Sequence, residues 1–174
     1  IGGVFNGIHA FAPSLSSAAA AGQPSFLLNI GSEHSLGVPP HVQALSVYTV
    51  TKYATMGLTD TARRDLEPLG VRVSMLAPGW VRTDNVLTAV RSSHAAAMSI
   101  EPFAQNPDVI ASAAFDGMLD GIHIIATNPA SRAFAMEHAR AVMADVQRLP
   151  YIDDPLGHDH DGTGDAAKCP VLNF

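Results

Sequence analysis

Strand-like and helical segments alternate along most of this chain, and that order constrains the fold more than any other feature. Three short apolar runs have the length and composition of buried strands. They are residues 25–30, 71–76 and 121–127. Helical spacing of apolar residues, or a run of strong helix formers, occupies the segments around them. These segments are residues 1–21, 44–68, 107–119 and 131–147. The alternation predicts an α/β fold in which three parallel strands are joined by right-handed crossover helices.

Two stretches lack either pattern. Residues 84–105 are mixed in character, and we expect an irregular segment there. Residues 151–174 are polar and rich in turn residues, which predicts a tail after a catalytic unit of residues 1–150. Pro13 lies within the first helical segment and should bend or shorten it.

Composition excludes several classes of function. The 174 residues carry a net charge of −6, and their ten Lys and Arg residues are scattered rather than clustered, so we expect no nucleic-acid partner. A single cysteine, Cys169, cannot form an internal disulfide, and no apolar run is long enough to cross a bilayer. We therefore expect a cytoplasmic protein without a membrane partner.

The predicted sheet indicates where a ligand would bind. In parallel α/β sheets the ligand lies beyond the carboxyl ends of the strands. That rule selects the loop of residues 31–40, which follows the first strand, and the loop of residues 77–84, which follows the second. The helix entered from the first of these loops begins with Tyr-Thr-Val-Thr-Lys, residues 48–52.

Tyr48 and Lys52 are four residues apart, so a helix places both side chains on one face. A free phenol has a pKa near ~10, and a nearby cation lowers the pKa of a phenol and makes it a usable acid or base at neutral pH. Ser32, directly after the first strand, could hydrogen-bond a substrate oxygen beside Tyr48. The alternative is an ordinary amphipathic helix with a packed tyrosine and a solvated lysine.

Four motifs occur in a characteristic order. A strand ends in Asn-Ile-Gly-Ser (29–32), the helix opens with Tyr-Thr-Val-Thr-Lys, a second strand is Val-Arg-Val-Ser-Met-Leu (71–76), and Pro-Gly-Trp-Val-Arg-Thr (78–83) follows it. In this order the sequence resembles the short-chain dehydrogenase/reductase family. The resemblance implies a Rossmann-like, doubly wound parallel sheet, an NAD or NADP cofactor, and an oxidoreductase that interconverts a carbonyl and a secondary alcohol as small-molecule substrates.

The resemblance also implies roles for individual residues. Ser32 would orient the substrate, Tyr48 would give or take the proton, and Lys52 would activate Tyr48 and bind the nicotinamide ribose. Ser35, thirteen residues before Tyr48, competes with Ser32 for the serine role. Four residues of the loop after the second strand would contact the nicotinamide end of the cofactor. They are Pro78, Gly79, Val81 and Thr83.

The chain departs from the family pattern at its beginning. No strand with a glycine-rich turn for a pyrophosphate precedes the first helix. We therefore expect this chain to be the carboxyl-terminal portion of a longer dehydrogenase, with the cofactor-binding half upstream of Ile1, and to be inactive by itself. Members of the family usually assemble through the corresponding helices, so the resemblance implies a homodimer or homotetramer formed through residues 1–21 and 44–68. The alternative function is a truncated, non-catalytic paralogue that docks onto a full-length subunit.

A His-Asp-His-Asp run at residues 158–161 carries metal-ligand atoms. Neighbours in an extended chain point in opposite directions, and no second cluster supplies further ligands. We expect a solvated tail and no metal site.

Overall fold

A computed structural model of the chain describes residues 1–42 and 45–148. Its centre is a three-stranded parallel sheet in the order β1-β2-β3. β1 (Ser25–Ile30) pairs with β2 (Val71–Leu76) along its whole length, from Ser25 opposite Val71 to Ile30 opposite Leu76. β2 also pairs with β3 (Ile124–Ile125). The predicted α/β fold with a parallel sheet is confirmed.

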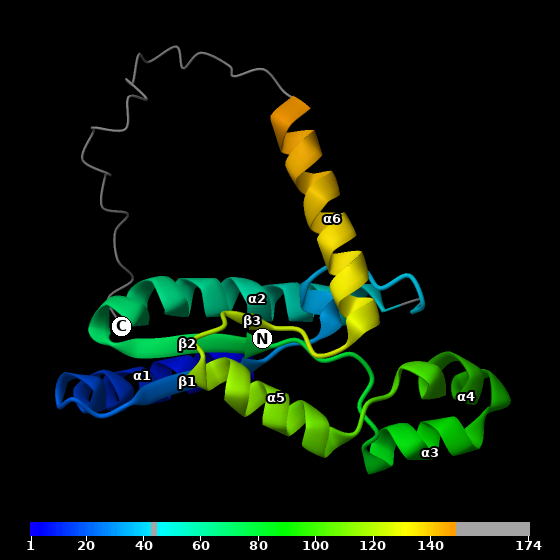
Figure 1. The fold of residues 1–174 in the computed structure, drawn as a ribbon, viewed down its shortest axis with the longest axis horizontal. Helices are drawn as coiled ribbons and strands as arrows, with labels where there is room; N and C mark the ends of the chain where they lie inside the picture. The colour runs from blue at the N-terminus through cyan, green and yellow to red at the C-terminus, as the bar shows by residue number, and fades with distance from the viewer. Residues whose placement is uncertain (43–44, 149–174) are drawn as a thin grey trace.

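The described part of the chain has six α-helices (Figure 1). They are α1 (Gly2–Ala20), α2 (Ser46–Leu66), α3 (Asp84–Ser92), α4 (His94–Ile100), α5 (Pro107–Leu119) and α6 (Pro129–Arg148). Three short 3-10 turns join them. These are η1 (Glu33–Ser35), η2 (Glu67–Leu69) and η3 (Glu101–Phe103). Of the six helices, α1, α2 and α5 pack on the sheet.

Two apolar clusters hold the helices on the sheet. In the first, Ala62 and Leu66 of α2 pack on Val71 and Val73 of β2, and one face of α1 packs against the same cluster. In the second, α5 packs on the other face of the sheet. Its members are Leu76, Ile110, Ala114 and Ile125. Figure 1 shows α2 and α5 on opposite sides of the strands. Burial of the valine, leucine and isoleucine side chains in these clusters stabilises the fold by roughly 1.5–3 kcal/mol each.

The interval of residues 84–105 differs from the prediction. It is not irregular, because α3, α4 and η3 occupy most of it. α3 packs on α4 rather than on the sheet. Two short helices that cover each other need no long apolar stripe, and a search for helical periodicity over the whole interval therefore misses them.

Two further element predictions need correction. The third strand is shorter than residues 121–127, because Gly121 takes a left-handed conformation (φ 71°) and the N–H of Ile122 donates to the carbonyl of Gly117. Residues 121–122 thus terminate α5 before the strand begins. Helix α1 continues through Pro13 without interruption. The predicted start of α5 is confirmed, since the Asn106 side chain accepts a hydrogen bond from the N–H of Asp108.

Over the part of the chain that the structure describes, no helix has both the length and the apolar character needed to cross a membrane. Within the same residues, no group of three or more His, Cys, Asp or Glu side chains could hold a metal ion. The predicted tail, with its His-Asp-His-Asp run, lies outside the described residues.

Candidate active site

The loops after β1 and β2 meet at the carboxyl edge of the sheet, as the parallel topology requires. The N–H of Gly31 donates to the carbonyl of Leu76 (2.8 Å), and the N–H of Glu33 donates to the carbonyl of Pro78 (2.8 Å). These two bonds fix η1 against the loop of residues 77–83. The first turns of α2 lie beside η1, so three segments form one site.

Lys52 connects α2 to the end of β1. Its ammonium donates to the Gly31 carbonyl (3.0 Å) and lies 5.4 Å from the centroid of the Tyr48 ring. Tyr48 is 41% exposed, so a substrate can reach its ring. The structure therefore places the tyrosine and the lysine together on one face of α2, beside the residue that precedes Ser32.

Ser32 and Ser35 are both buried, but their hydroxyls are engaged differently. Ser35 Oγ accepts from the N–H of Ser32 (3.2 Å) and donates to the carbonyl of Lys52 (2.8 Å). Ser32 Oγ accepts from the N–H of His34 (3.3 Å) and forms a capping box with Ser35, in which it also accepts from the Ser35 backbone. Ser32 thus caps η1 and keeps its hydroxyl hydrogen for another acceptor, whereas the Ser35 hydrogen is already donated.

The loop after β2 places its four predicted residues in different surroundings. A Cβ on Gly79 would lie 3.0 Å from Asn128 Nδ2 and 3.1 Å from Glu33 Oε2, which explains a residue without a side chain there. Val81 forms a bridge to Gln105 and packs against the second apolar cluster. Thr83 begins α3 without a side-chain capping bond and is exposed, so its hydroxyl can serve a ligand.

Glu33 is a residue of this site that the sequence reasoning missed. It is 4% exposed, and its Oε2 accepts a hydrogen bond from the fully buried Ser131 of α6. Its Oε1 lies 3.3 Å from Nε2 of His41, whose ring stacks on Phe103. A buried carboxylate needs such partners. Glu33 therefore ties η1 to α6 and to the loop of residues 36–42.

His34 lies between Ser32 and Tyr48. Its Nδ1 is 2.8 Å from Thr49 Oγ1, and its ring meets the Tyr48 ring edge to face, with centroids 5.1 Å apart. Burial lowers the pKa of His34 below its usual 6.5, the Glu33 charge opposes that shift, and His41 and Lys52 add to it. The imidazole is therefore neutral at neutral pH.

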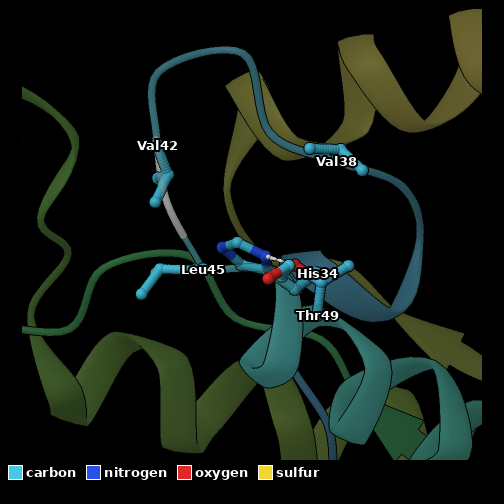
Figure 2. A pocket seen from close by; sticks show the side chains of 6 residues that line it. His34, Val38, Val42, Leu45 and Thr49 are labelled. Carbon is cyan, nitrogen blue, oxygen red and sulfur yellow. Dashed lines mark hydrogen bonds between the residues drawn. The ribbon is translucent and has the colours of Figure 1, made fainter.

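A pocket of about 370 Å³ lies beside His34. It is lined by His34, Val38, Val42, Leu45, Ser46 and Thr49. Figure 2 shows that the wall combines the loop after η1 with the start of α2. The pocket and Tyr48 share His34 as a common wall, so a molecule in this pocket lies close to the candidate catalytic tyrosine.

Ser32, Tyr48 and Lys52 thus lie near the carboxyl edge of the sheet, and the loop of residues 78–83 is hydrogen-bonded to η1. Neither Glu33 nor His34 was singled out by the sequence analysis. The available signal was their place in the loop directly after a buried strand, where polar side chains face the ligand.

Comparison with known proteins identifies the family of this chain. The family model described as short chain dehydrogenase matches residues 1–93, which is more than half of the chain. The short-chain dehydrogenase anuF of Penicillium roqueforti (strain FM164) is 42% identical over 67 residues, or 38% of this chain and 23% of that protein. The A-factor type gamma-butyrolactone 1'-reductase (1S-forming) of Streptomyces virginiae is 30% identical over 106 residues, or 61% of this chain and 34% of that protein.

The fold is also found among solved structures. A short-chain dehydrogenase from Burkholderia cenocepacia J2315, determined in complex with NADP, superposes with a TM-score of 0.62 at 20% identity. The match covers 85% of this chain and 55% of that one, so the chain spans about half the length of this structure and less of the two relatives above. The family match over residues 1–93, the parallel sheet and the order of the site residues lead to one conclusion: this chain belongs to the short-chain dehydrogenase family, a class of oxidoreductases.

Proposed function

We propose that the protein carrying residues 1–174 is an NAD(P)-dependent oxidoreductase that interconverts a carbonyl and a secondary alcohol. The observation that carries the proposal is the convergence of Ser32, Tyr48 and Lys52 at the carboxyl edge of the sheet, with Lys52 bound to the Gly31 carbonyl beside Ser32. In this proposal the three side chains, which come from two segments, act on one reacting oxygen of the substrate. This is the arrangement that proton transfer to or from such an oxygen requires.

Each residue has a chemical task in this proposal. The Tyr48 hydroxyl donates its proton to the carbonyl oxygen during reduction and takes one from the alcohol during oxidation. The Ser32 hydroxyl, whose hydrogen is not used within the described residues, donates a hydrogen bond to the same oxygen and orients it. The Lys52 ammonium, 5.4 Å from the Tyr48 ring centroid, stabilises negative charge on the phenol oxygen.

A nicotinamide cofactor would supply the hydride that completes this reaction. The groups that face the carboxyl edge suit its nicotinamide end, since Lys52 and Thr83 offer hydrogen-bond donors and Gly79 keeps the loop close to Glu33. The Burkholderia cenocepacia relative was determined with NADP, which supports a nicotinamide cofactor here as well. The choice between NAD and NADP stays open in this proposal.

Three earlier expectations stay predictions. They are a cofactor-binding half upstream of Ile1, assembly as a homodimer or homotetramer, and a cytoplasmic location. The reading frame upstream of the codon for Ile1 tests the first of them directly. The non-catalytic paralogue is not favoured, because all three proposed catalytic residues are retained and lie at one site.

A tyrosine pair tests the function. We expect Tyr48→Phe in the native gene product to lower kcat/KM for ketone reduction with NADH or NADPH by about 10²- to 10⁴-fold, because a proton donor is lost. Tyr53→Phe is the matched control. Tyr53 lies on the same helix, is 40% exposed, and pairs with His138 (3.3 Å) on α6. A Tyr48→Phe enzyme that keeps the rate of the Tyr53→Phe enzyme would refute the proposal.

A further inference from the structure

The pocket beside His34 is apolar except at a few atoms. Val38, Val42 and Leu45 supply its apolar wall, and Leu45 and Val38 are themselves exposed to the opening. The polar atoms come from His34, Ser46 and Thr49. An apolar cleft with very few polar groups is the usual form of a small-molecule site, in which the polar groups set orientation and selectivity.

The orientation of the His34 ring is fixed from one side. Nδ1 is bonded to Thr49 Oγ1 at 2.8 Å, and the Tyr48 ring packs against the imidazole. Thr49 follows Tyr48 directly on α2, so the ring is held by the same helical turn that presents the candidate catalytic tyrosine. Because the ring orientation is fixed, the direction of its second nitrogen, Nε2, is fixed as well.

That second nitrogen, Nε2, faces the pocket. Figure 2 shows it turned away from Thr49, on the side of the pocket that carries Val42 and Leu45. Within the described residues, no hydrogen-bond partner of Nε2 is present. Because the ring is neutral, Nε2 makes one hydrogen bond, as donor or acceptor according to the tautomer, and the Thr49 hydroxyl can complement either form.

We propose that His34 is a specificity-determining residue whose Nε2 binds a second oxygen function on the substrate. This inference rests on the proposed function and deepens it. The preferred substrate class is a ketone or secondary alcohol whose apolar substituent carries a further hydroxyl or carbonyl oxygen, a few bonds from the reacting carbon. The apolar part lies against Val38, Val42 and Leu45.

The physical basis is the cost of leaving Nε2 without a partner. A site that hydrogen-bonds a substrate oxygen discriminates strongly against an analogue that lacks it, because the polar group of the site then stays unpaired. Val38 and Leu45 at this pocket are exposed to solvent. A water molecule can therefore form part of the hydrogen bonding to Nε2 when the substrate lacks the second oxygen. We therefore expect a discrimination of about 10- to 100-fold rather than the larger factors of closed sites.

The test compares two substrates in the native gene product. One is an unbranched ketone, and the other is the same ketone with a hydroxyl two to four bonds from the carbonyl. The ratio of their kcat/KM values is measured, because any effect common to both substrates cancels. We expect a wild-type ratio of about 10 to 100 in favour of the hydroxyketone, a ratio near one in His34→Leu, and a partly retained preference in His34→Gln.

A second variant identifies the polar group responsible. Ser46 also lines the pocket, so Ser46→Ala should keep the wild-type ratio. A preference that survives His34→Leu, or one that Ser46→Ala abolishes instead, would overturn the assignment. Turnover of both ketones without any preference would overturn it as well, while leaving the proposed function intact.

Failure of the proposed function is distinguished by a binding measurement. If neither ketone is turned over with NADH or NADPH, the oxidoreductase proposal fails. The role of His34 is then tested by nitrogen-15 NMR of labelled histidine in the same protein. Addition of the hydroxyketone should shift the His34 Nε2 resonance, whereas the plain ketone should not. Equal shifts, or none, would overturn the inference.

Discussion

Two serines three residues apart occupy very different chemical positions. Ser35 joins η1 to α2, because its hydroxyl accepts from the N–H of Ser32 and donates to the carbonyl of Lys52. The Ser32 hydroxyl accepts from backbone N–H groups of η1, and it donates to no group within the described residues. Loss of the Ser35 hydroxyl removes a partner from the buried Ser32 N–H and from the part-buried Lys52 carbonyl. Loss of the Ser32 hydroxyl removes a donor that a substrate oxygen can use.

The two serines should therefore separate stability from activity. We expect Ser35→Ala to lower the free energy of unfolding by about 1–3 kcal/mol. Ser32→Ala should instead lower kcat/KM by about 10²-fold, the typical effect of removing one donor to a reacting oxygen. Denaturant unfolding and steady-state kinetics of both variants check this. A large activity loss confined to Ser35→Ala would reverse the assignment of the two serines.

For single residues, the sequence predicts those placements that depend only on spacing within one helix or strand. The four-residue step from Tyr48 to Lys52 is enough to place both on one face of a helix. The role of Glu33 could not be predicted, because its partner Ser131 lies 98 residues away in sequence. The choice between Ser32 and Ser35 depends on the capping geometry of η1, which is too short a turn to be recognised from sequence.

Close packing between α5 and β3 rests on a glycine. A Cβ on Gly117 would lie 2.8 Å from Cγ1 and 2.9 Å from Cδ1 of Ile125, and Ile125 is itself buried. Gly57 of α2 is a helical glycine with open space around the equivalent position. The two positions differ in tertiary packing and share the same helical propensity.

The glycine pair allows a matched test of that packing. We expect Gly57→Ala to raise the free energy of unfolding by about 0.5–1 kcal/mol, since alanine is the better helix former. Gly117→Ala should lower it, because overpacking costs roughly 1–3 kcal/mol and outweighs the gain in propensity. Thermal or chemical unfolding measures both. If Gly117→Ala is as stabilising as Gly57→Ala, α5 does not pack on Ile125 in this way.

The elements that were predicted correctly are those that bury a continuous face. The runs at residues 25–30 and 71–76 are buried strands, and the long apolar stripe of α2 contributes Ala62 and Leu66 to the first cluster. Helices α3 and α4 were missed because they cover each other, and the length of β3 was misjudged because residues 121–122 end α5. Both errors depend on tertiary contacts that periodicity does not record.

The molecule as a whole exposes a considerable number of large apolar side chains. On the side of the sheet that carries α1 and α2, Phe11 is 61% exposed, Val47 is 77% exposed and Val50 is 64% exposed. Within the described residues β1 also forms an edge of the sheet, with β2 as its one neighbour. Exposed apolar faces and open strand edges favour association with other chains.

We accordingly expect residues 1–174, expressed alone, to form species larger than a monomer at micromolar concentration. The double substitution Val47→Lys and Val50→Lys should shift the chain toward the monomer, because two charges then interrupt the apolar surface of α2. The same change at Val142 and Val146 on α6 is the control and should leave association unchanged. Sedimentation velocity distinguishes these cases. A wild-type chain that sediments as a monomer would contradict the prediction.

The open edge of β1 has a consequence for isotope exchange. The N–H of Gly31 points at β2, where it bonds to the carbonyl of Leu76, and alternate amides of a parallel strand point the same way. The amides of residues 27 and 29 therefore point at β2 and are protected from exchange. The amides of residues 26, 28 and 30 point to the unpaired edge of the sheet. Deuterium uptake along these residues should alternate between slow and fast wherever the edge is bare. Slow exchange at all of these amides would instead indicate that a second strand is hydrogen-bonded along β1. Deuterium uptake at these few residues therefore shows whether the edge of the sheet is paired with another strand.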